Sequence, residues 1–99
     1  MRVISRQRFH EFAEKHRDAK RPLDDWYREA KRAAWTSHQD VKAQYRNASI
    51  ARDCVVFNIG GSKFRLVAWI YYPAAIVYVK GVYTHREYDE AAFDCRRSS

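Results

Sequence analysis

The sequence predicts an α+β fold in which two N-terminal helices pack on one face of an antiparallel β-sheet and a short helix ends the chain. Apolar residues recur at helical spacing through the first half, whereas the second half is rich in β-branched and aromatic residues separated by turn signals. A capping-box pattern near the C-terminus indicates the last helix. The 99 residues show no internal break in composition, so we expect residues 1–99 to form a single domain.

The first half of the chain carries the predicted long helices. After the opening stretch MRVIS, which is compatible with an edge strand, Ser5 is suited to cap a first helix whose apolar positions begin at Phe9. Pro22 suits the first turn of a second helix, and Trp26 belongs to its apolar stripe. Residues 37–40 have the form of a capping box and predict a short third helix.

Three strands are expected in the second half, at residues 54–59, 63–72 and 75–83. Gly60-Gly61 is a preferred two-residue hairpin loop, and Pro73-Ala74 marks the next reversal. The strands therefore predict an antiparallel meander.

The register of these hairpins predicts which side chains share a face. Two-residue loops place Asn58 opposite Lys63, Val56 opposite Arg65, and Arg65 opposite Val82. One face is then almost wholly apolar and suits the two helices. The other face collects a mixture of cations, amides and aromatic rings: Asn58, Lys63, Arg65, Trp69, Tyr71, Tyr78 and Lys80. Such a face can hold phosphates while bases stack on its rings; the alternative is the ordinary solvated face of an antiparallel sheet.

The last helix is expected to begin at His85, because residues 84–87 form a second capping box. His85 and Tyr88 are three residues apart and so project from neighbouring positions beside the strand that carries Lys80. An imidazole exchanges protons near neutral pH, which is what acid–base catalysis requires. The alternative is a histidine that is structural or merely exposed.

The charge of the chain favours a polyanionic partner. Nineteen Lys and Arg against twelve Asp and Glu give a net charge of +7 and a pI near 9.7, although a basic surface that only aids solubility remains the alternative. No apolar run approaches the roughly 20 residues of a membrane-spanning helix, and the N-terminus lacks the pattern of a signal peptide. We therefore expect a cytoplasmic protein with no membrane partner.

The sequence offers no pattern for a bound metal or a small-molecule cofactor. His10, His16 and His38 lack the spacing of a metal-binding helix, and there is no glycine-rich phosphate loop. Cys54 and Cys95 have no CxxC partner, so we expect both to be reduced, with Cys54 buried in a strand.

Two segments carry a resemblance to a known family. The hairpin VVFNIGGSKFRLV (55–67) and the segment VYVKGVYTHREYD (77–89) resemble the HigB family of toxins, within the wider RelE-like group. In that family an FN-x-GG hairpin and a THxEYD motif recur together, and the similarity extends over nearly the whole chain. Here Ser62 stands where asparagine is common, and residues 81–83 replace the more usual stretch.

The resemblance implies a RelE-like fold and a metal-independent mRNA endonuclease, often acting on translating ribosomes and neutralised by a HigA-like helix-turn-helix antitoxin. The predicted reaction is attack of a 2′-hydroxyl on its adjacent phosphate. The expected catalytic residues are Arg65, Lys80, His85 and Tyr88, and the expected RNA-binding residues are Asn58, Lys63, Trp69, Tyr78 and Arg86. Two rival interpretations are a non-catalytic binder of RNA or ribosomes and an inactive toxin that only engages its antitoxin.

Overall fold

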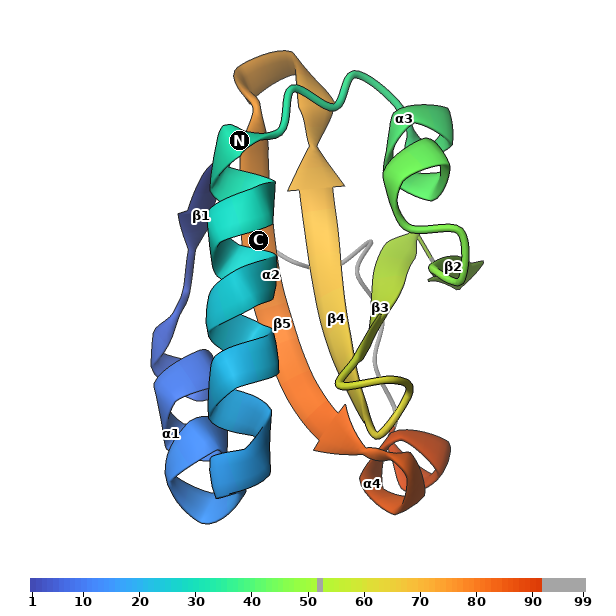
Figure 1. The fold of residues 1–99 in the computed structure, drawn as a ribbon. Helices are drawn as coiled ribbons and strands as arrows, with labels where there is room; N and C mark the ends of the chain where they lie inside the picture. Colours follow the sequence, from blue (N-terminus) through green and yellow to red (C-terminus); the bar gives the residue numbers. More distant parts are fainter. Residues whose placement is uncertain (52, 92–99) are drawn as a thin grey trace.

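A computed structural model describes residues 1–51 and 53–91 of the chain (Figure 1). In Figure 1, α2 passes in front of β5 with α1 beside it, α3 lies over the β3 side, and α4 lies below the β3–β4 turn. The elements follow in the order β1 (Arg2–Ile4), α1 (Gln7–Lys15), a 3₁₀ turn (Arg17–Ala19), α2 (Lys20–Arg32), α3 (His38–Gln44), β2 (Ser49–Ala51), β3 (Cys54–Ile59), β4 (Phe64–Tyr71), a 3₁₀ turn (Tyr72–Ala74), β5 (Ile76–Thr84) and α4 (His85–Glu90). The predicted α+β class is confirmed.

The sheet has five strands in the order β1-β5-β4-β3-β2. The expected antiparallel meander of β3, β4 and β5 is present, and β2 extends it as a further antiparallel edge strand. The expectation of a wholly antiparallel sheet is wrong at the other edge, where β1 pairs parallel to β5 with Val3 opposite Val77. Because helices and strands separate β1 from β5 in the sequence, no hairpin constrains their relative direction.

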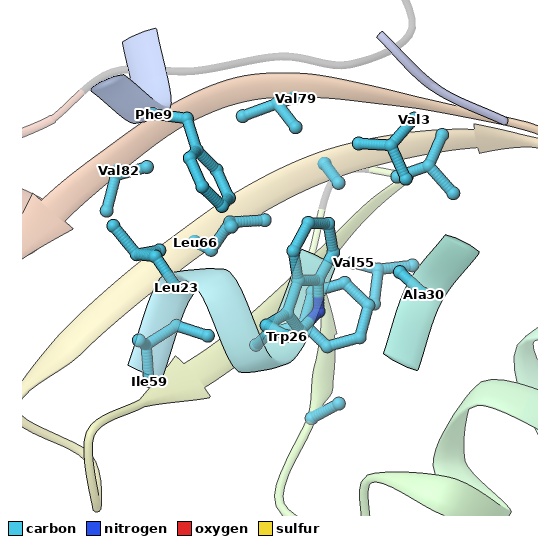
Figure 2. Close-up of a cluster of buried hydrophobic side chains, with 14 of the residues drawn as sticks. Val3, Phe9, Leu23, Trp26, Ala30, Val55, Ile59, Leu66, Val79 and Val82 are labelled. Atoms are coloured by element: carbon cyan, nitrogen blue, oxygen red, sulfur yellow. The ribbon is translucent and has the colours of Figure 1, made fainter. Parts of the chain in front are cut away.

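The hydrophobic core lies between the sheet and the helices α1 and α2 (Figure 2). Leu23 and Ala30 of α2 are fully buried, and the Trp26 ring packs edge-on against Phe57 of β3, with 5.2 Å between the ring centroids. Alternate residues of each strand reach the same core. Figure 2 shows side chains from both layers meeting there: Val3, Phe9, Leu23, Trp26, Ala30, Val55, Ile59, Leu66, Val79 and Val82.

The β3–β4 turn is longer than expected. Ser62 adopts a left-handed φ of 78°, like the two glycines before it, and the Lys63 amide donates to the Gly60 carbonyl over 3.3 Å. The loop is therefore Gly60 to Lys63, and Asn58 pairs with Arg65 rather than with Lys63. A shift of two residues preserves the faces, because side chains alternate with a period of two. The predicted pairing was wrong, but Asn58 and Arg65 still share a face.

The β4–β5 turn also exceeds two residues, but its register matches the prediction near the loop. Residues 72–75 form the turn, with Ala75 in the left-handed region and its amide bonded to the Tyr72 carbonyl at 3.0 Å. The loop has gained one residue at each end, so Trp69 pairs with Tyr78 as expected.

The helices are short, and their caps only partly match the sequence patterns. Ser5 has a φ of 67° and does not cap α1, which starts at Gln7. Ser37 precedes α3 without a side-chain bond; instead the Thr36 hydroxyl donates to Asp40 over 2.6 Å. The capping box of Thr84 is confirmed. Within residues 1–51 and 53–91, no helix has the length and apolarity that crossing a bilayer requires.

Candidate active site

The face of the sheet turned away from α1 and α2, here called the site face, carries the predicted functional residues. Leu66, Ala68 and Ile70 of β4 point into the core, so the residues that alternate with them point to the opposite side. A small apolar floor of Cys54, Val56 and Val67 lies on this side, and Trp69, Tyr83 and Tyr88 pack against it. The register adds Asn58, Arg65, Tyr71, Tyr78 and Gly81.

Arg65 is the centre of the site. Its Nη2 lies 3.5 Å from His85 Nδ1, and its guanidinium carbon lies 5.1 Å from the centre of the Tyr88 ring. Arg65 Nε is buried and has no hydrogen-bond partner in the described chain. The structure therefore brings together three of the four expected catalytic residues, with one donor of the guanidinium still unsatisfied.

His85 is held by hydrogen bonds at both ring nitrogens. Its Nε2 contacts the backbone carbonyl of Ser62, which can only accept, so Nε2 carries the hydrogen. Its Nδ1 faces Arg65, which can only donate. These partners assign the neutral tautomer whose basic lone pair is on Nδ1.

The position of His85 follows from the cap of α4. The Thr84 hydroxyl accepts from the Glu87 amide over 3.2 Å, and the Glu87 carboxylate accepts from the Thr84 amide over 2.9 Å. This reciprocal pair ends β5 and starts the helix at His85. One helical turn later, Tyr88 comes to lie beside Arg65.

Lys80 occupies a β-bulge in β5. Val67 pairs with Gly81 and Ala68 with Val79, which leaves Lys80 without an opposite residue on β4. Arg8 of α1 donates to the Lys80 carbonyl at this point. The Lys80 ammonium lies 5.8 Å from the Tyr78 ring, and partial burial, followed by the charge of Arg8, lowers its pKa below the usual lysine value.

The bulge corrects the predicted register beyond this point. Arg65 pairs with Tyr83, not with Val82, which is instead buried in the core. Tyr83 therefore occupies the site face directly across from Arg65. Gly81, an isolated glycine inside the strand, is the sequence signal that could have indicated the bulge.

The aromatic residues of the site face form a group next to the Arg65 cluster. The Trp69 ring stacks on Tyr71 at 5.7 Å between centroids and lies 5.2 Å from Tyr78. Tyr71 is 44% exposed, which is unusual for a large aromatic side chain in this protein. The expected RNA-binding residues Trp69 and Tyr78 are thus in contact with each other and reachable from solvent.

Asn58, Lys63 and Arg86 lie at different edges of the site. Asn58 donates from Nδ2 to the Asn47 carbonyl over 3.1 Å and lines a cavity of about 270 Å³. The prediction that Lys63 lies on the site face is wrong, because the longer turn places it in the β3–β4 loop at the end of the sheet. There its Nζ lies 2.5 Å from Asp18 Oδ2, and this hydrogen bond lowers the Asp18 pKa. Arg86 is exposed in the first turn of α4.

Cys54 departs from the expectation of a reduced thiol. It is fully buried in β3, as predicted, but it is disulfide-bonded. Cys95 lies outside the described residues. Within residues 1–51 and 53–91, no group of three or more His, Cys, Asp or Glu side chains is arranged as metal ligands would be.

Comparisons with known proteins agree with the resemblance seen in the sequence. A 34-residue segment, 34% of the chain, is 44% identical to the "mRNA interferase toxin HigB" of Escherichia coli (strain K12) and covers 33% of that protein. The "mRNA interferase HigB" of Shigella flexneri gives the same figures, so the match spans about a third of these relatives. The "mRNA interferase HigB" of Escherichia coli O6:H1 (strain CFT073) is 26% identical over 93 residues, 91% of this chain and 90% of the relative.

The family assignment depends on a longer match than these short segments. The model of the HigB toxin family, described as the RelE-like toxic component of a toxin–antitoxin system, matches residues 19–91. That range contains both motifs and all the residues gathered around Arg65. The chain therefore belongs to the HigB toxin family, the RelE-like toxic components of toxin–antitoxin systems.

Proposed function

We propose that this protein is an endoribonuclease that cleaves mRNA as the toxin of a toxin–antitoxin pair. The observation that carries the proposal is the contact of Arg65 with both His85 and Tyr88 on the face of the sheet turned away from α1 and α2. The relatives named as mRNA interferases and the net charge of +7 support the same substrate class.

The proposed reaction is an internal transesterification of the RNA. The 2′-oxygen forms a bond to the adjacent phosphorus while the bond from phosphorus to the 5′-oxygen breaks. The products are a 2′,3′-cyclic phosphate and a free 5′-hydroxyl. One proton must leave the 2′-hydroxyl and another must reach the departing 5′-oxygen, so no metal or external nucleophile is needed to balance the step.

The residues around Arg65 can perform these tasks. The guanidinium is suited to bind the phosphate and stabilise the charge that grows on it, because it offers several donors in a fixed plane. Once Arg65 engages the phosphate, His85 Nδ1 is free to take the proton of the 2′-hydroxyl. We assign the proton donor to Tyr88, and Lys80 adds positive charge beside the RNA path.

The proposed setting is the cytoplasm, with mRNA on the translating ribosome as the substrate and a HigA-like helix-turn-helix antitoxin as the inhibitory partner. The RNA around the cleaved bond would contact Asn58, Trp69, Tyr78 and Arg86. Lys63 would contribute to RNA binding at most from the β3–β4 loop. Binding of single-stranded RNA by cations and aromatic rings needs no base pairing in the substrate.

The test is to express the protein and its Arg65→Ala and His85→Ala variants briefly in bacteria and to map new 5′ ends across all transcripts. Wild-type protein should create 5′-hydroxyl ends within translated messages, and both variants should lose them. A reporter message without its ribosome-binding site should escape cleavage if the ribosome is required. A 2′-deoxy nucleotide at the cleaved position should block the reaction on a defined substrate.

Two outcomes would contradict this proposal. Translation arrest with intact messages would support the non-catalytic binder, whose affinity should fall steeply with salt concentration. Cleavage that persists in both variants would overturn the site assignment.

A further inference from the structure

We propose that Tyr83 is an RNA-binding residue that stacks on the base next to the cleaved bond, and that Gly81 is required to seat its ring. This inference rests on the proposed function, because it assumes that RNA is cleaved at Arg65. Tyr83 lies within the segment 77–89 that resembles the family, but in residues 81–83, where this chain departs from the more usual stretch, and it reaches the site face only because of the bulge at Lys80.

The first step is the position of Tyr83 on the site face. Tyr83 pairs with Arg65 across β4 and β5, and its ring packs against the apolar floor together with Tyr88. It is only partly buried, so part of its side chain is exposed to solvent. A base placed on this ring would be directly beside a phosphate bound to Arg65.

The second step is the direction of the ring along β5. A Cβ added at Gly81 would lie 2.5 Å from Tyr83 Oη and 2.7 Å from Cζ, so the ring lies over Gly81 in the space that a side chain would fill. Gly81 pairs with Val67, and the next pair on this face is Trp69 with Tyr78. The Tyr83 ring therefore lies between the level of the Arg65–Tyr83 pair and that of the Trp69–Tyr78 pair.

The third step is what this continuity provides. Successive same-face positions on a strand are about 7 Å apart. Arg65, the Tyr83 ring over Gly81, and Trp69 thus occupy successive positions along the site face. Aromatic rings in sequence bind single-stranded RNA with little base preference, because every base has a face to stack. The geometry points to an extended single-stranded substrate that leaves the cleavage point over Tyr83 towards Trp69.

The role of Gly81 follows from the close approach. Gly81 lies outside the left-handed region, so alanine is compatible with its backbone, but the new methyl group must displace the Tyr83 ring. The two positions should therefore be coupled. Gly81 acts through Tyr83 and has no direct part in binding RNA.

The experiment measures binding of a short, fully 2′-O-methylated RNA by fluorescence anisotropy, which cleavage cannot affect. Tyr83→Ala should raise Kd about tenfold, in the range for loss of one stacked base. Tyr83→Phe should bind like wild type, whereas Tyr83→Leu, which can still cover the apolar floor, should bind nearly as weakly as alanine. Thermal unfolding of each variant checks that the fold is retained.

A double-mutant cycle tests the coupling. Gly81→Ala should raise Kd several-fold in the wild-type background and have no further effect when Tyr83 is already alanine. Tight binding by Tyr83→Leu would overturn the stacking role, and equal effects of Gly81→Ala in both backgrounds would overturn the seating role. Because the binding assay does not depend on catalysis, failure of the stacking role can be told apart from failure of the proposed cleavage.

Discussion

The two faces of strand β4 differ in what they contain and in what they can do. On the core side, Phe64, Leu66, Ala68 and Ile70 are at most 5% exposed. On the site face, Arg65 and Trp69 are half-buried and Tyr71 is exposed, with only Val67 fully buried between them. The alternation shows that one strand supplies stability from every second residue and chemistry from the others. Mutations on the core side should thus mainly lower stability, whereas mutations on the site face should mainly lower activity.

The largest expected effect separates Arg65 from Leu66. Arg65→Ala should reduce the cleavage rate by a factor of about 100 to 1,000, typical of losing a donor to a developing charge, and leave unfolding nearly unchanged. Leu66→Ala should lower the free energy of unfolding by about 2–5 kcal/mol, while the protein that remains folded cleaves normally. Single-turnover cleavage and denaturant titration measure the two quantities. Comparable losses of both in each variant would contradict the division between faces.

The next effect concerns His85. His85→Ala should slow cleavage by a factor of about 100 to 10,000, the usual range for a general acid or base. Thr84→Ala is the matched control, because it removes the cap of α4 but keeps the imidazole, and should cost about 1 kcal/mol of helix stability. Cleavage by His85→Ala at nearly the wild-type rate would contradict the role of the imidazole.

A smaller effect should appear in the pH dependence of RNA binding. Lys80 has a lowered pKa, because burial and Arg8 disfavour its charge. Its contribution to binding should therefore fade as the pH rises through that lowered value, which a pH series of binding measurements with 2′-O-methylated RNA would detect. The same burial makes the charged form costly to the fold below the lowered pKa, and this cost fades as the pH rises from that value towards the ordinary lysine pKa. Lys80→Arg stays charged and should flatten the alkaline limb; an unchanged limb would exclude Lys80 as its cause.

The smallest effect is expected at Lys63. It pairs with Asp18 at the exposed end of the sheet, and such exposed ion pairs contribute little to stability. Lys63→Ala should change cleavage by less than a factor of about five. Because Lys63 lowers the Asp18 pKa, any stability from the pair is present at neutral pH and is lost as the pH falls through the lowered value. A loss of cleavage as large as that of Arg65→Ala would instead show that Lys63 belongs to the RNA-binding surface.

Much of the site could be predicted because the error in the β3–β4 register was a shift of two residues, which leaves each side chain on the same face of the sheet. The β3–β4 loop was two residues too short in the prediction, yet Asn58 and Arg65 stayed on one face. The capping box of Thr84 correctly placed His85 at the start of α4. Tyr83 could not be found this way, because a one-residue bulge reverses the faces of every residue beyond it.

The sequence by itself determined the fold class, the order of the central strands, the apolar face and the motifs around Arg65 and His85. These follow from local periodicity and caps, which each segment carries within itself. Only the tertiary structure decided the parallel pairing of β1, the contact of Lys63 with Asp18 and the exchange of Val82 for Tyr83 opposite Arg65. The first two depend on contacts between residues far apart in the chain, which local patterns do not encode, and the third follows from the bulge, where the Lys80 carbonyl accepts from Arg8 of α1.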